Sequence, residues 1–526
     1  PRGRRRRRAG LVRMPMACAA QHTAATVAGS ALELVVVGAG PAGLAVVSRL
    51  ARDACKGCSS TAVQRERWRT LLEGTRVVDP AGGWLDEWRR KLGSQGVTQL
   101  RSPTFVHPHP SRVVDDALLA FARAQRRTAE LAPLPCGDGW AAPSAALFED
   151  FCASVARDFC GGPLESCLVR GRVVDVRPLS GGGFELDLEG GARLRSARVV
   201  LALGDGGVLR VPSWLPEGRH APVLPSPVVL HASHLGAASS CDGAWVRPRS
   251  AAQRAAWWLV CAMAARPRWL PLLRRLVRCA TAGGRAGAAS LAWPRGRGRL
   301  VVVGGGLSGA QLAIHALRLG WAHVSLLLRD EVQVRPFDID AEWMARHHKL
   351  DFSPLEQQFY RAAPPRRREL LRAARPGGSL TPGCLAQLGE LQRRGGLRVL
   401  QRASVGEAVI DGDGCWELRL RGAAGEASTA ALHADALWLA TGHELDASRV
   451  ALLQRVLHQS PRPLHGGLPE LTPSLRWAEG SELFLAGPYA ALQVGPDAFN
   501  LAGCAAAAAR IAAAILDGVI AQEAST

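Results

Sequence analysis

The sequence predicts an α/β protein with two domains, each built on a parallel sheet between two outer layers. Two segments carry this prediction, because each places an apolar strand directly before a glycine-rich turn and an apolar helix: "ELVVVGAGPAGLAVVSRL" and "RLVVVGGGLSGAQLAIHALRLG". Two further apolar runs, 199–204 and 436–442, end in glycine and are typical of buried strands. The chain has 526 residues, which is enough for two such domains.

The first glycine turn has the spacing of a dinucleotide-binding fingerprint. Gly38, Gly40 and Gly43 form G-x-G-x-x-G, with Ala39 and Pro41 between them. In this motif the glycines allow a tight turn, a close approach of the backbone to a pyrophosphate, and packing of the helix on the strand. The phosphates then meet N–H groups at the positive end of the helix dipole. We assign this first Rossmann-type unit to FAD.

An acidic residue should hold the ribose hydroxyls of this nucleotide. Glu66 fits the usual spacing of about 20 residues after the glycine turn. Asp79 lies further on, but it follows the apolar pair Val77-Val78, where a second strand would end. We therefore predict that Asp79 binds the ribose and that an insertion surrounds residues 55–68, with Glu66 as the alternative.

The second glycine turn contains Gly304, Gly306 and Gly309. After the next apolar strand, "HVSLLLRD", Arg329 stands where an NAD-binding site places an acidic residue. An arginine there can pair with a 2′-phosphate, which favours NADPH over NADH. Asp330 beside it leaves a solvated surface arginine as the alternative.

The net charge of +20 does not by itself indicate a nucleic-acid partner. Nearly all the basic residues are Arg, the chain contains a single Asn and two Tyr, and no nucleic-acid-binding motif is present. This composition is typical of coding bias, which spreads charge over a surface without forming a patch. We predict no nucleic-acid partner.

Two segments stand apart in composition. Residues 1–31 contain the run Arg4–Arg8 and no acidic residue, which is typical either of a plastid or mitochondrial transit peptide or of a disordered leader on a cytoplasmic protein. Residues 241–299 are basic and rich in Trp; we interpret them as a surface insertion, with a peripheral membrane contact as the alternative. No run of about 18 uncharged apolar residues occurs, so no membrane-spanning helix is predicted.

The cysteines and histidines give no strong metal or redox motif. Cys55 and Cys58 form a lone Cys-x-x-Cys without a second pair at zinc-ligand spacing. We interpret this spacing as chance, with a redox dithiol as the alternative. His107-Pro-His109 is interpreted as a polar loop, and no metal site is predicted.

Motifs near the second turn resemble a known family. The segment "DALWLATGH" is similar to a family strand motif of Asp, three residues, Leu or Phe, then Ala-Thr-Gly-Tyr, with His443 in place of the Tyr. The turn "GGGLSG" has the family's G-x-G-x-S-G form, with Ser308 as its serine. The chain thus resembles the class B flavin monooxygenases, most closely the N-hydroxylating lysine/ornithine monooxygenases. The residues that match the strand motif are Asp435, Leu439, Ala440, Thr441 and Gly442.

Two further segments resemble those that surround the flavin in this family. They are "GGWLDEWRRKLGSQGVTQLRSPTFVHP", which leads to the flavin face, and "ELFLAGPYAALQVGPDAFNLAG", with the last strand and the helix that covers the flavin. The candidate catalytic residues are Asn500, the only Asn in the chain, and Ser308. The Asn500 amide can hydrogen-bond the flavin or bound oxygen, and a helix N-cap is the equal alternative. The residues that this resemblance places near the flavin are Trp84, Arg101, Ser102, Gly487, Gln493 and Asn500.

The resemblance implies an FAD- and NADPH-dependent monooxygenase. Such an enzyme passes one oxygen atom from O2, carried on the flavin C4a, to a nucleophilic N or S of a small amine or sulfide. The family's amino-acid sites use Lys and Asn, which are scarce here, so ornithine or lysine does not carry over as substrate. The alternatives are a flavin oxidase, a disulfide reductase and a non-enzymatic flavin-binding protein. Relatives of this kind often form homo-oligomers.

The order of motifs predicts an FAD domain that is discontinuous in sequence. The FAD-binding domain is expected to begin in the first segment and to return after the NADPH-binding domain, which carries the insertion. The expected boundaries are 1–31 for the leader, 32–207 for the first part of the FAD domain, 208–445 for the NADPH domain and 446–526 for the return.

Overall fold

The computed structural model describes twelve stretches of the chain. They are residues 22–23, 31–56, 61–110, 116–135, 139–164, 166–204, 208–215, 228–232, 298–344, 353–411, 415–422 and 427–521. Most of the leader 1–31, Cys58 and nearly all of the insertion 241–299 lie outside the described residues, so the predictions for these segments stay predictions.

The first sheet has eight strands in the order β1-β6-β3-β2-β9-β8-β7, with β22 also beside β9. The strands β6, β3, β2, β9 and β22 run parallel, and β9 continues into an antiparallel meander with β8 and β7. The chain returns to this sheet through β22 after the second domain, as the discontinuous domain predicted from the sequence requires. The bounds are β1 (His22–Thr23), β2 (Ala31–Val37), β3 (Thr75–Asp79), β6 (Leu168–Arg170), β7 (Val173–Pro178), β8 (Phe184–Leu188), β9 (Arg193–Leu201) and β22 (Leu483–Leu485).

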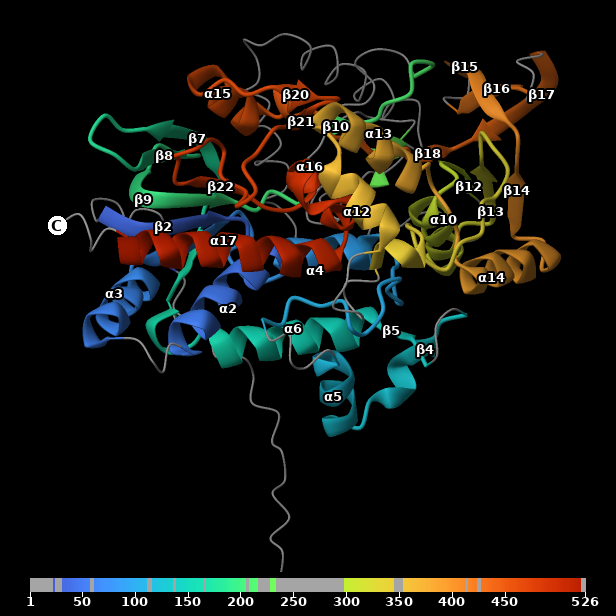
Figure 1. The fold of residues 1–526 in the computed structure, drawn as a ribbon. Helices are drawn as coiled ribbons and strands as arrows, with labels where there is room; N and C mark the ends of the chain where they lie inside the picture. Colours follow the sequence, from blue (N-terminus) through green and yellow to red (C-terminus); the bar gives the residue numbers. More distant parts are fainter. Residues whose placement is uncertain are drawn as a thin grey trace, which may run out of the picture.

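Helices cover both faces of the first sheet (Figure 1). The helices α2 and α17 pack side by side against β2 and β9, with α3 and α6 beside them, while α15 packs on β7 from the other side. Because the central strands are buried on both faces, they are continuous apolar runs such as "LVVV". The bounds are α2 (Pro41–Lys56), α3 (Ala62–Glu73), α4 (Asp86–Ser94), α5 (Ala117–Ala124), α6 (Ala145–Phe159), α15 (Ala451–Gln459), α16 (Ala491–Val494) and α17 (Leu501–Ala521).

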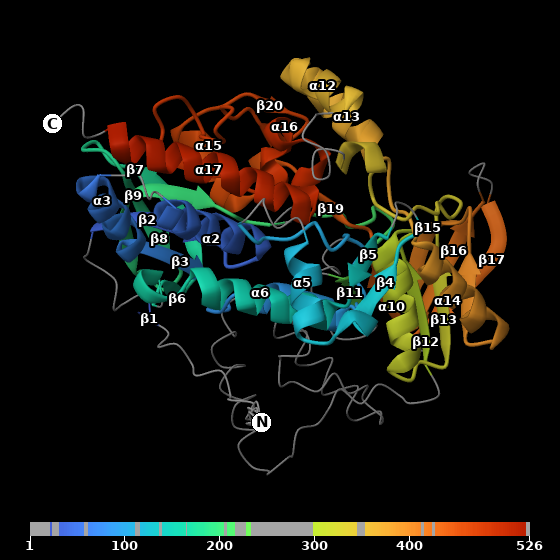
Figure 2. The same cartoon turned by 60° about the horizontal axis from the view of Figure 1, so that its bottom comes forward.

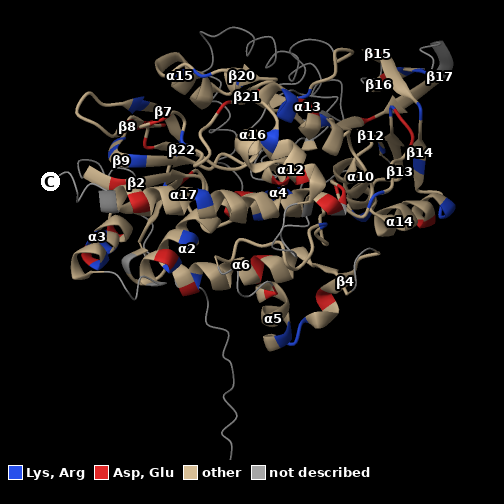
Figure 3. Ribbon diagram, in the orientation of Figure 1, with Lys and Arg blue, Asp and Glu red and all other residues tan. Residues whose placement is uncertain are grey.

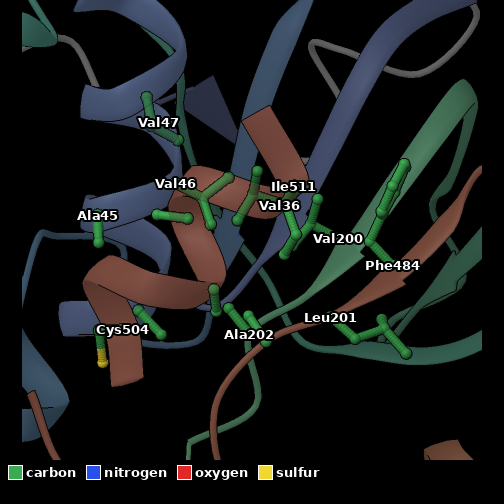
Figure 4. Close-up of a cluster of buried hydrophobic side chains, with 14 of the residues drawn as sticks. Val36, Ala45, Val46, Val47, Val200, Leu201, Ala202, Phe484, Cys504 and Ile511 are labelled. Carbon is green, nitrogen blue, oxygen red and sulfur yellow. The ribbon is translucent and has the colours of Figure 1, made fainter. Parts of the chain in front are cut away.

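The helix α17 is the centre of this core. Figure 4 shows Ile511 and Cys504 of α17 among side chains of α2, β2, β9 and β22. Residues Leu501–Val519 are long and apolar enough to cross a bilayer by length and composition alone, and 56% of this stretch is buried inside the protein. Ile511 and Ile515 are fully buried against the first core, so the packing accounts for the apolar composition.

The second sheet has five parallel strands in the order β11-β18-β12-β13-β14. One face packs on α10 and α14, and the other on the antiparallel sheet β15-β16-β17. Side chains alternate between these layers: Val302 and Trp438 face the helices, whereas Leu437 faces the small sheet. The bounds are β11 (Val228–His231), β12 (Arg299–Val303), α10 (Leu307–Arg318), β13 (His323–Leu327), α14 (Pro382–Arg393), β14 (Leu397–Leu400), β15 (Ser404–Ile410), β16 (Trp416–Arg421), β17 (Ala427–Ala434) and β18 (Ala436–Leu439).

Two segments join the domains. The short strands β10 (Val208–Leu209) and β19 (His443–Glu444) pair antiparallel where the chain enters and leaves the second domain. The segment with η5 (Ala341–Met344), α12 (Pro354–Arg361) and α13 (Pro364–Ala374) interrupts the second domain in sequence. It packs instead into the first core, through Phe337, Trp343 and Phe359 among others. Figure 2 shows α12 and α13 beside α16, on the side of the first domain.

The remaining described elements are short. They are η1 (Thr128–Glu130), β4 (Leu131–Pro133), β5 (Ala141–Pro143), η2 (Gly162–Leu164), η6 (Ala447–Arg449), β20 (Leu464–His465), β21 (Leu468–Pro469), η7 (Pro488–Ala490) and η8 (Pro496–Phe499).

Candidate functional site: two glycine turns at the ends of two parallel sheets

The first glycine turn connects β2 to α2 and has the contacts that the motif requires. Gly38 has a positive φ of 112°, and a Cβ placed on it would lie 2.4 Å from the carbonyl oxygen of Ala202. A Cβ on Gly43 would lie 2.0 Å from the carbonyl oxygen of Gly38, so only glycine lets α2 start this close to β2. Beside Gly40, no atom of the described residues comes within 4 Å of the Cβ position. Backbone atoms of the protein therefore contact the turn at Gly38 and Gly43, whereas the space beside Gly40 is free of described atoms and a pyrophosphate could approach there.

The carboxylate of Asp79 lies directly beside this turn. Asp79 ends β3 and is 8% exposed. One carboxylate oxygen accepts a hydrogen bond from the Ala39 N–H at 2.9 Å, and the other accepts one from the Ala81 N–H at 2.8 Å. These bonds fix a negative charge where a nucleotide ribose would meet the end of the second strand.

Glu66, the alternative to Asp79, lies elsewhere. It is on the exposed face of α3 and pairs with Arg69 at 2.6 Å. The hydrogen bond from Arg69 lowers the pKa of this carboxyl. The geometry favours Asp79 over Glu66 as the acidic residue of the first site.

Two further glycines lie at the same edge of the first sheet. Gly487 follows β22 with a φ of 84°, and its Cβ position lies 4.0 Å from the N atom of Gly204, which follows β9 with a φ of 64°. The ends of β2, β3, β9 and β22 thus meet at one edge, where ligands of open α/β sheets bind. Gly487 is among the residues predicted from the sequence, whereas Gly204 is not, although the apolar run 199–204 that ends in this glycine marks the end of a strand.

The second glycine turn repeats the contacts of the first. Gly304 has a φ of 143°, and its Cβ position lies 2.3 Å from the carbonyl oxygen of Ala440. A Cβ on Gly309 would lie 2.1 Å from the carbonyl oxygen of Gly304. The two turns differ at the middle glycine: the Cβ position of Gly306 lies 3.3 Å from the Cα of Gly378.

Arg329 and Ser308 are both on the surface near this second turn. Arg329 lies just beyond the end of β13, its side chain is 83% exposed, and it pairs with Asp330 at 3.2 Å. The position fits a 2′-phosphate ligand, and the exposure equally fits the solvated arginine of the alternative. Ser308 is exposed in the first turn of α10, at the N-terminal end of the helix.

The "DALWLATGH" segment forms the crossing between the domains. The Arg299 N–H donates to the Asp435 carboxylate at 2.8 Å at the start of β12, so Asp435 ties β18 to its neighbour. The Thr441 hydroxyl donates to the carbonyl oxygen of Arg210, and the Arg210 N–H donates to the carbonyl oxygen of Gly442 at 3.0 Å. Thr441 and Gly442 therefore hold the two linking strands together, and Ala440 supplies the carbonyl against which Gly304 packs.

Arg101 holds the two domains together through backbone carbonyls. Its Nε donates to the carbonyl oxygen of Pro336 at 3.1 Å, and its Nη2 donates to the carbonyl oxygens of Arg335, at 2.8 Å, and Phe337. Nη2 also donates to the Ser379 hydroxyl at 2.9 Å. Burial lowers the pKa of this guanidinium, Asp338 raises it, and Arg375 and Arg335 lower it. These contacts place Arg101 where the two domains meet, and the flavin contact predicted from the sequence stays a prediction.

Three other residues predicted to lie near the flavin make contacts within the protein or are partly buried. The Gln493 amide donates to the carbonyl oxygen of Leu471 at 2.6 Å, and its oxygen accepts from Arg367 at 3.1 Å. Trp84 is half-buried and packs against the first core, and Ser102 is half-buried. Gln493 is thus a structural residue in this geometry.

Asn500 caps the N-terminus of α17. Its side-chain oxygen accepts from the N–H of Ala502 at 2.9 Å and of Gly503 at 3.4 Å, and its amide donates to the Asp497 carboxylate at 3.1 Å. Both ends of the amide are therefore used within the helix start, which is the capping alternative. The catalytic role of Asn500 stays a prediction beside this observed cap.

The thiols of the described residues give no dithiol at the first turn. Cys55 is exposed at the far end of α2, about 20 Å along the helix axis from the glycine turn. Its proposed partner Cys58 lies outside the described residues. Burial raises the pKa of Cys384 to about 11 and that of Cys504 to about 12, so these thiols stay protonated at neutral pH.

The described residues contain no cluster of three or more metal-ligating side chains. His107 and His109 lie in a loop, as predicted, but they pack against the ring of Phe151 in an aromatic cluster rather than forming a polar surface. A cavity of about 600 Å³ between the meander and α15 contains none of the predicted site residues. Figure 3 shows basic and acidic residues distributed along the ribbon of both domains.

The comparisons with known proteins agree with this architecture. A family model described as FAD-NAD(P)-binding matches residues 35–206. No curated protein sequence matches the chain.

Solved structures match the chain over nearly its whole length. Ornithine hydroxylase (PvdA) from Pseudomonas aeruginosa matches with a TM-score of 0.61 and 16% identity, covering 93% of this chain and 99% of that protein. Ornithine N-hydroxylase (KtzI) from Kutzneria sp. 744 matches with a TM-score of 0.60 and 14% identity, covering 93% and 100%. L-lysine 6-monooxygenase from Pseudomonas syringae matches with a TM-score of 0.57 and 16% identity, covering 93% and 100%. The chain therefore has the fold of the N-hydroxylating class B flavin monooxygenases, with an FAD-NAD(P)-binding segment at residues 35–206.

Proposed function

We propose that this protein is an FAD- and NADPH-dependent monooxygenase that transfers one oxygen atom from O2 to a nucleophilic N or S of a small molecule. The observation that carries the proposal is the pair of glycine turns, each at the carboxyl end of a parallel sheet, in a chain with the fold of N-hydroxylating enzymes. A single turn of this kind would support nucleotide binding only; two turns support electron transfer between two cofactors.

The residues of the first turn fit FAD. Gly40 leaves room for a pyrophosphate, and the N-terminus of the 16-residue helix α2 supplies N–H groups and a positive dipole end for its charge. The Asp79 carboxylate accepts two backbone hydrogen bonds and can accept further ones from ribose hydroxyls. Gly204 and Gly487 have no side chains, so at these two positions only backbone atoms line the edge of the first sheet over which the rest of the cofactor would pass.

The residues of the second turn fit a nicotinamide dinucleotide. The N-terminus of α10, with the exposed Ser308 hydroxyl in its first turn, faces the phosphates, and Arg329 at the end of β13 can pair with a 2′-phosphate. When bound, the flavin supplies hydride acceptance from the nicotinamide and activation of O2. The protein's own contribution is to bind and orient the two cofactors and to keep water from the reacting centre.

The substrate is proposed as an amine or a sulfide. The proteins with matching folds act, by their names, on ornithine and lysine, which carry a nucleophilic amine. This chain has one Asn and three Lys, so we do not extend their particular substrates to it.

The test uses purified full-length protein. We expect a flavin absorbance spectrum, NADPH oxidation under air, and an increase in that rate with an accepted amine or sulfide while hydrogen peroxide release falls. Peroxide release that equals NADPH consumption with every substrate would show an oxidase. Loss of NADPH turnover in Cys55→Ser/Cys58→Ser would show a disulfide reductase, and absence of bound flavin would refute the proposal.

A further inference from the structure

A short loop covers the second glycine turn, and no described residue occupies the corresponding place at the first. A Cβ on Gly378 would lie 2.5 Å from the Cα and 2.8 Å from the N of Gly306. At the first turn, the equivalent space beside Gly40 holds no atom of the described residues within 4 Å. The middle glycine of this motif is the one whose backbone a pyrophosphate approaches. The backbone of Gly378 therefore stands where the ligand's pyrophosphate is expected.

The covering loop, residues 376–379, is anchored at both ends. At one end Arg375 pairs with Asp338 and its guanidinium lies 4.8 Å from the ring centre of Phe499. At the other end the Leu380 N–H donates to the carbonyl oxygen of Gln333 at 2.8 Å. Between the anchors, Gly377 has a φ of 152°, and no described atom lies within 4 Å of its Cβ position. Movement of the loop is thus confined to four residues, two of which have no side chain to repack.

One side chain from the other domain holds the loop down. Arg101 donates from Nη2 to the Ser379 hydroxyl at 2.9 Å, and from Nε and Nη2 to the carbonyl oxygens of residues 335–337. The same strip is tied to the loop's end, because the Arg335 N–H donates to the carbonyl oxygen of Leu380 at 2.9 Å. Arg101 is therefore the one described side chain of the first domain that hydrogen-bonds this loop.

We propose that loop 376–379 is a cover over the second dinucleotide site and that Arg101 is the positioning residue that keeps it closed. A dinucleotide that binds at Gly306 must displace Gly378, and the Arg101–Ser379 hydrogen bond opposes this displacement. The inference rests on the proposed function, since it takes the second turn to be the NADPH site. It adds that access to this site is controlled from the FAD domain.

Weakening the Arg101–Ser379 hydrogen bond should increase the affinity for NADP+. A site that is open for only a fraction of the time binds with its intrinsic affinity multiplied by that fraction. In FAD-loaded protein, we expect Arg101→Lys to tighten NADP+ binding about tenfold by isothermal titration calorimetry, since an ammonium cannot serve acceptors in the fork geometry of a guanidinium. Ser379→Ala removes a single acceptor and should tighten binding by a smaller factor.

The matched control is Arg367→Lys. Arg367 is also a half-buried arginine that donates to carbonyl oxygens, of Leu492 and Tyr360, and burial also lowers the pKa of its guanidinium. Its hydrogen bonds within the described part of the chain do not reach the loop, so its substitution should leave NADP+ affinity unchanged.

The outcomes separate this inference from the proposed function. Unchanged or weaker NADP+ binding in both Arg101→Lys and Ser379→Ala, with FAD still bound, would overturn the cover and leave the proposed function intact. Absence of NADP+ binding in the wild type and all variants, again with FAD bound, would overturn the nicotinamide part of the proposed function, and the inference with it.

Discussion

The Asp79 carboxylate accepts a hydrogen bond from the backbone N–H of Ala39, inside the first glycine turn. This bond connects the ends of β3 and β2, so the acidic residue and the turn are held in one arrangement before any ligand binds. Its second oxygen accepts from the Ala81 N–H. Asp79 thus has two functions that can be separated by substitution: it orders the turn, and it is proposed to hold a ribose.

We expect Asp79→Asn to weaken FAD binding and to lower the free energy of unfolding by about 1–3 kcal/mol, because one of the two buried N–H groups loses its acceptor. FAD affinity is measured by fluorescence titration of the apoprotein and stability by chemical denaturation. Glu66→Gln is the control, since Glu66 is exposed and pairs only with neighbours on α3. A loss of FAD in Glu66→Gln that equals the loss in Asp79→Asn would contradict the assignment.

Gly40 and Gly43 of the first turn should respond differently to a methyl group. Gly40→Ala meets no described atom within 4 Å, so we expect a folded protein whose FAD binding is weakened by about 2 kcal/mol, or about 30-fold. Gly43→Ala places a Cβ 2.0 Å from a backbone carbonyl and should cost about 3 kcal/mol of stability or more. Thermal unfolding with and without added FAD distinguishes the two. If Gly40→Ala bound FAD like the wild type, the pyrophosphate would have to lie elsewhere.

The parts of this fold that could be predicted from the sequence are those set by local patterns. The strand, turn and helix around Gly38 and Gly304 follow from apolar periodicity and glycine spacing, and Asp79 follows from its place at the end of an apolar strand. What the sequence did not predict depends on contacts between distant residues. Arg101 bonds residues 335–337, and α12 and α13 pack into the first core although they lie between strands of the second domain.

Asn500 shows the same limit at a single residue. Its rarity and its place before an Ala-rich helix suited both a ligand contact and an N-cap, and the composition could not separate them. The side-chain hydrogen bonds to the N–H groups of Ala502 and Gly503 show that Asn500 caps α17. Gln493 was similar: its neighbours Arg367 and Leu471 are far from it in sequence and use both ends of its amide.

A capping role for Asn500 predicts a stability effect. Asn500→Ala should lower the free energy of unfolding by about 1 kcal/mol, and Asn500→Ser should restore most of it, because Ser is also a preferred N-cap. The flavin absorbance maximum and the FAD affinity should be the same in both variants. A shift of the flavin spectrum in Asn500→Ser at unchanged stability would instead indicate a contact with the cofactor.

Arg329 should select NADPH over NADH if it pairs with a 2′-phosphate. Removing one charge-assisted hydrogen bond costs about 1.5–3 kcal/mol, so Arg329→Ala should lower the ratio of NADPH to NADH affinity about tenfold or more at low ionic strength. The effect should shrink in high salt, because the side chain is exposed. Arg394→Ala, which removes an exposed arginine paired with Glu390 on α14, is the control. An unchanged ratio in Arg329→Ala would mean that this arginine is only a surface residue.

We expect His315, at the interface between the domains, to make the stability of the protein depend on pH. The residue lies on α10, and the Cβ position of Gly96 in the first domain is 2.5 Å from its ring. Burial, with the nearby Arg318, lowers the pKa of His315 below its ordinary value of 6.5. Between the lowered pKa and 6.5, His315 is therefore protonated in the unfolded chain and neutral in the folded chain.

The sign of the effect follows from this shift. Above pH 6.5 His315 is neutral in both states and its contribution to stability is complete; as the pH falls from 6.5 through the lowered pKa, stability is lost. The slope is at most about 1.4 kcal/mol per pH unit, and less for a half-buried ring. We expect His315→Gln to flatten the decline in melting temperature as the pH falls below 6.5. His323→Gln, an exposed histidine on β13 of the same domain, should keep the wild-type slope. Equal slopes in the wild type and His315→Gln would remove this histidine as a source of the pH dependence and assign it to carboxylates elsewhere in the chain.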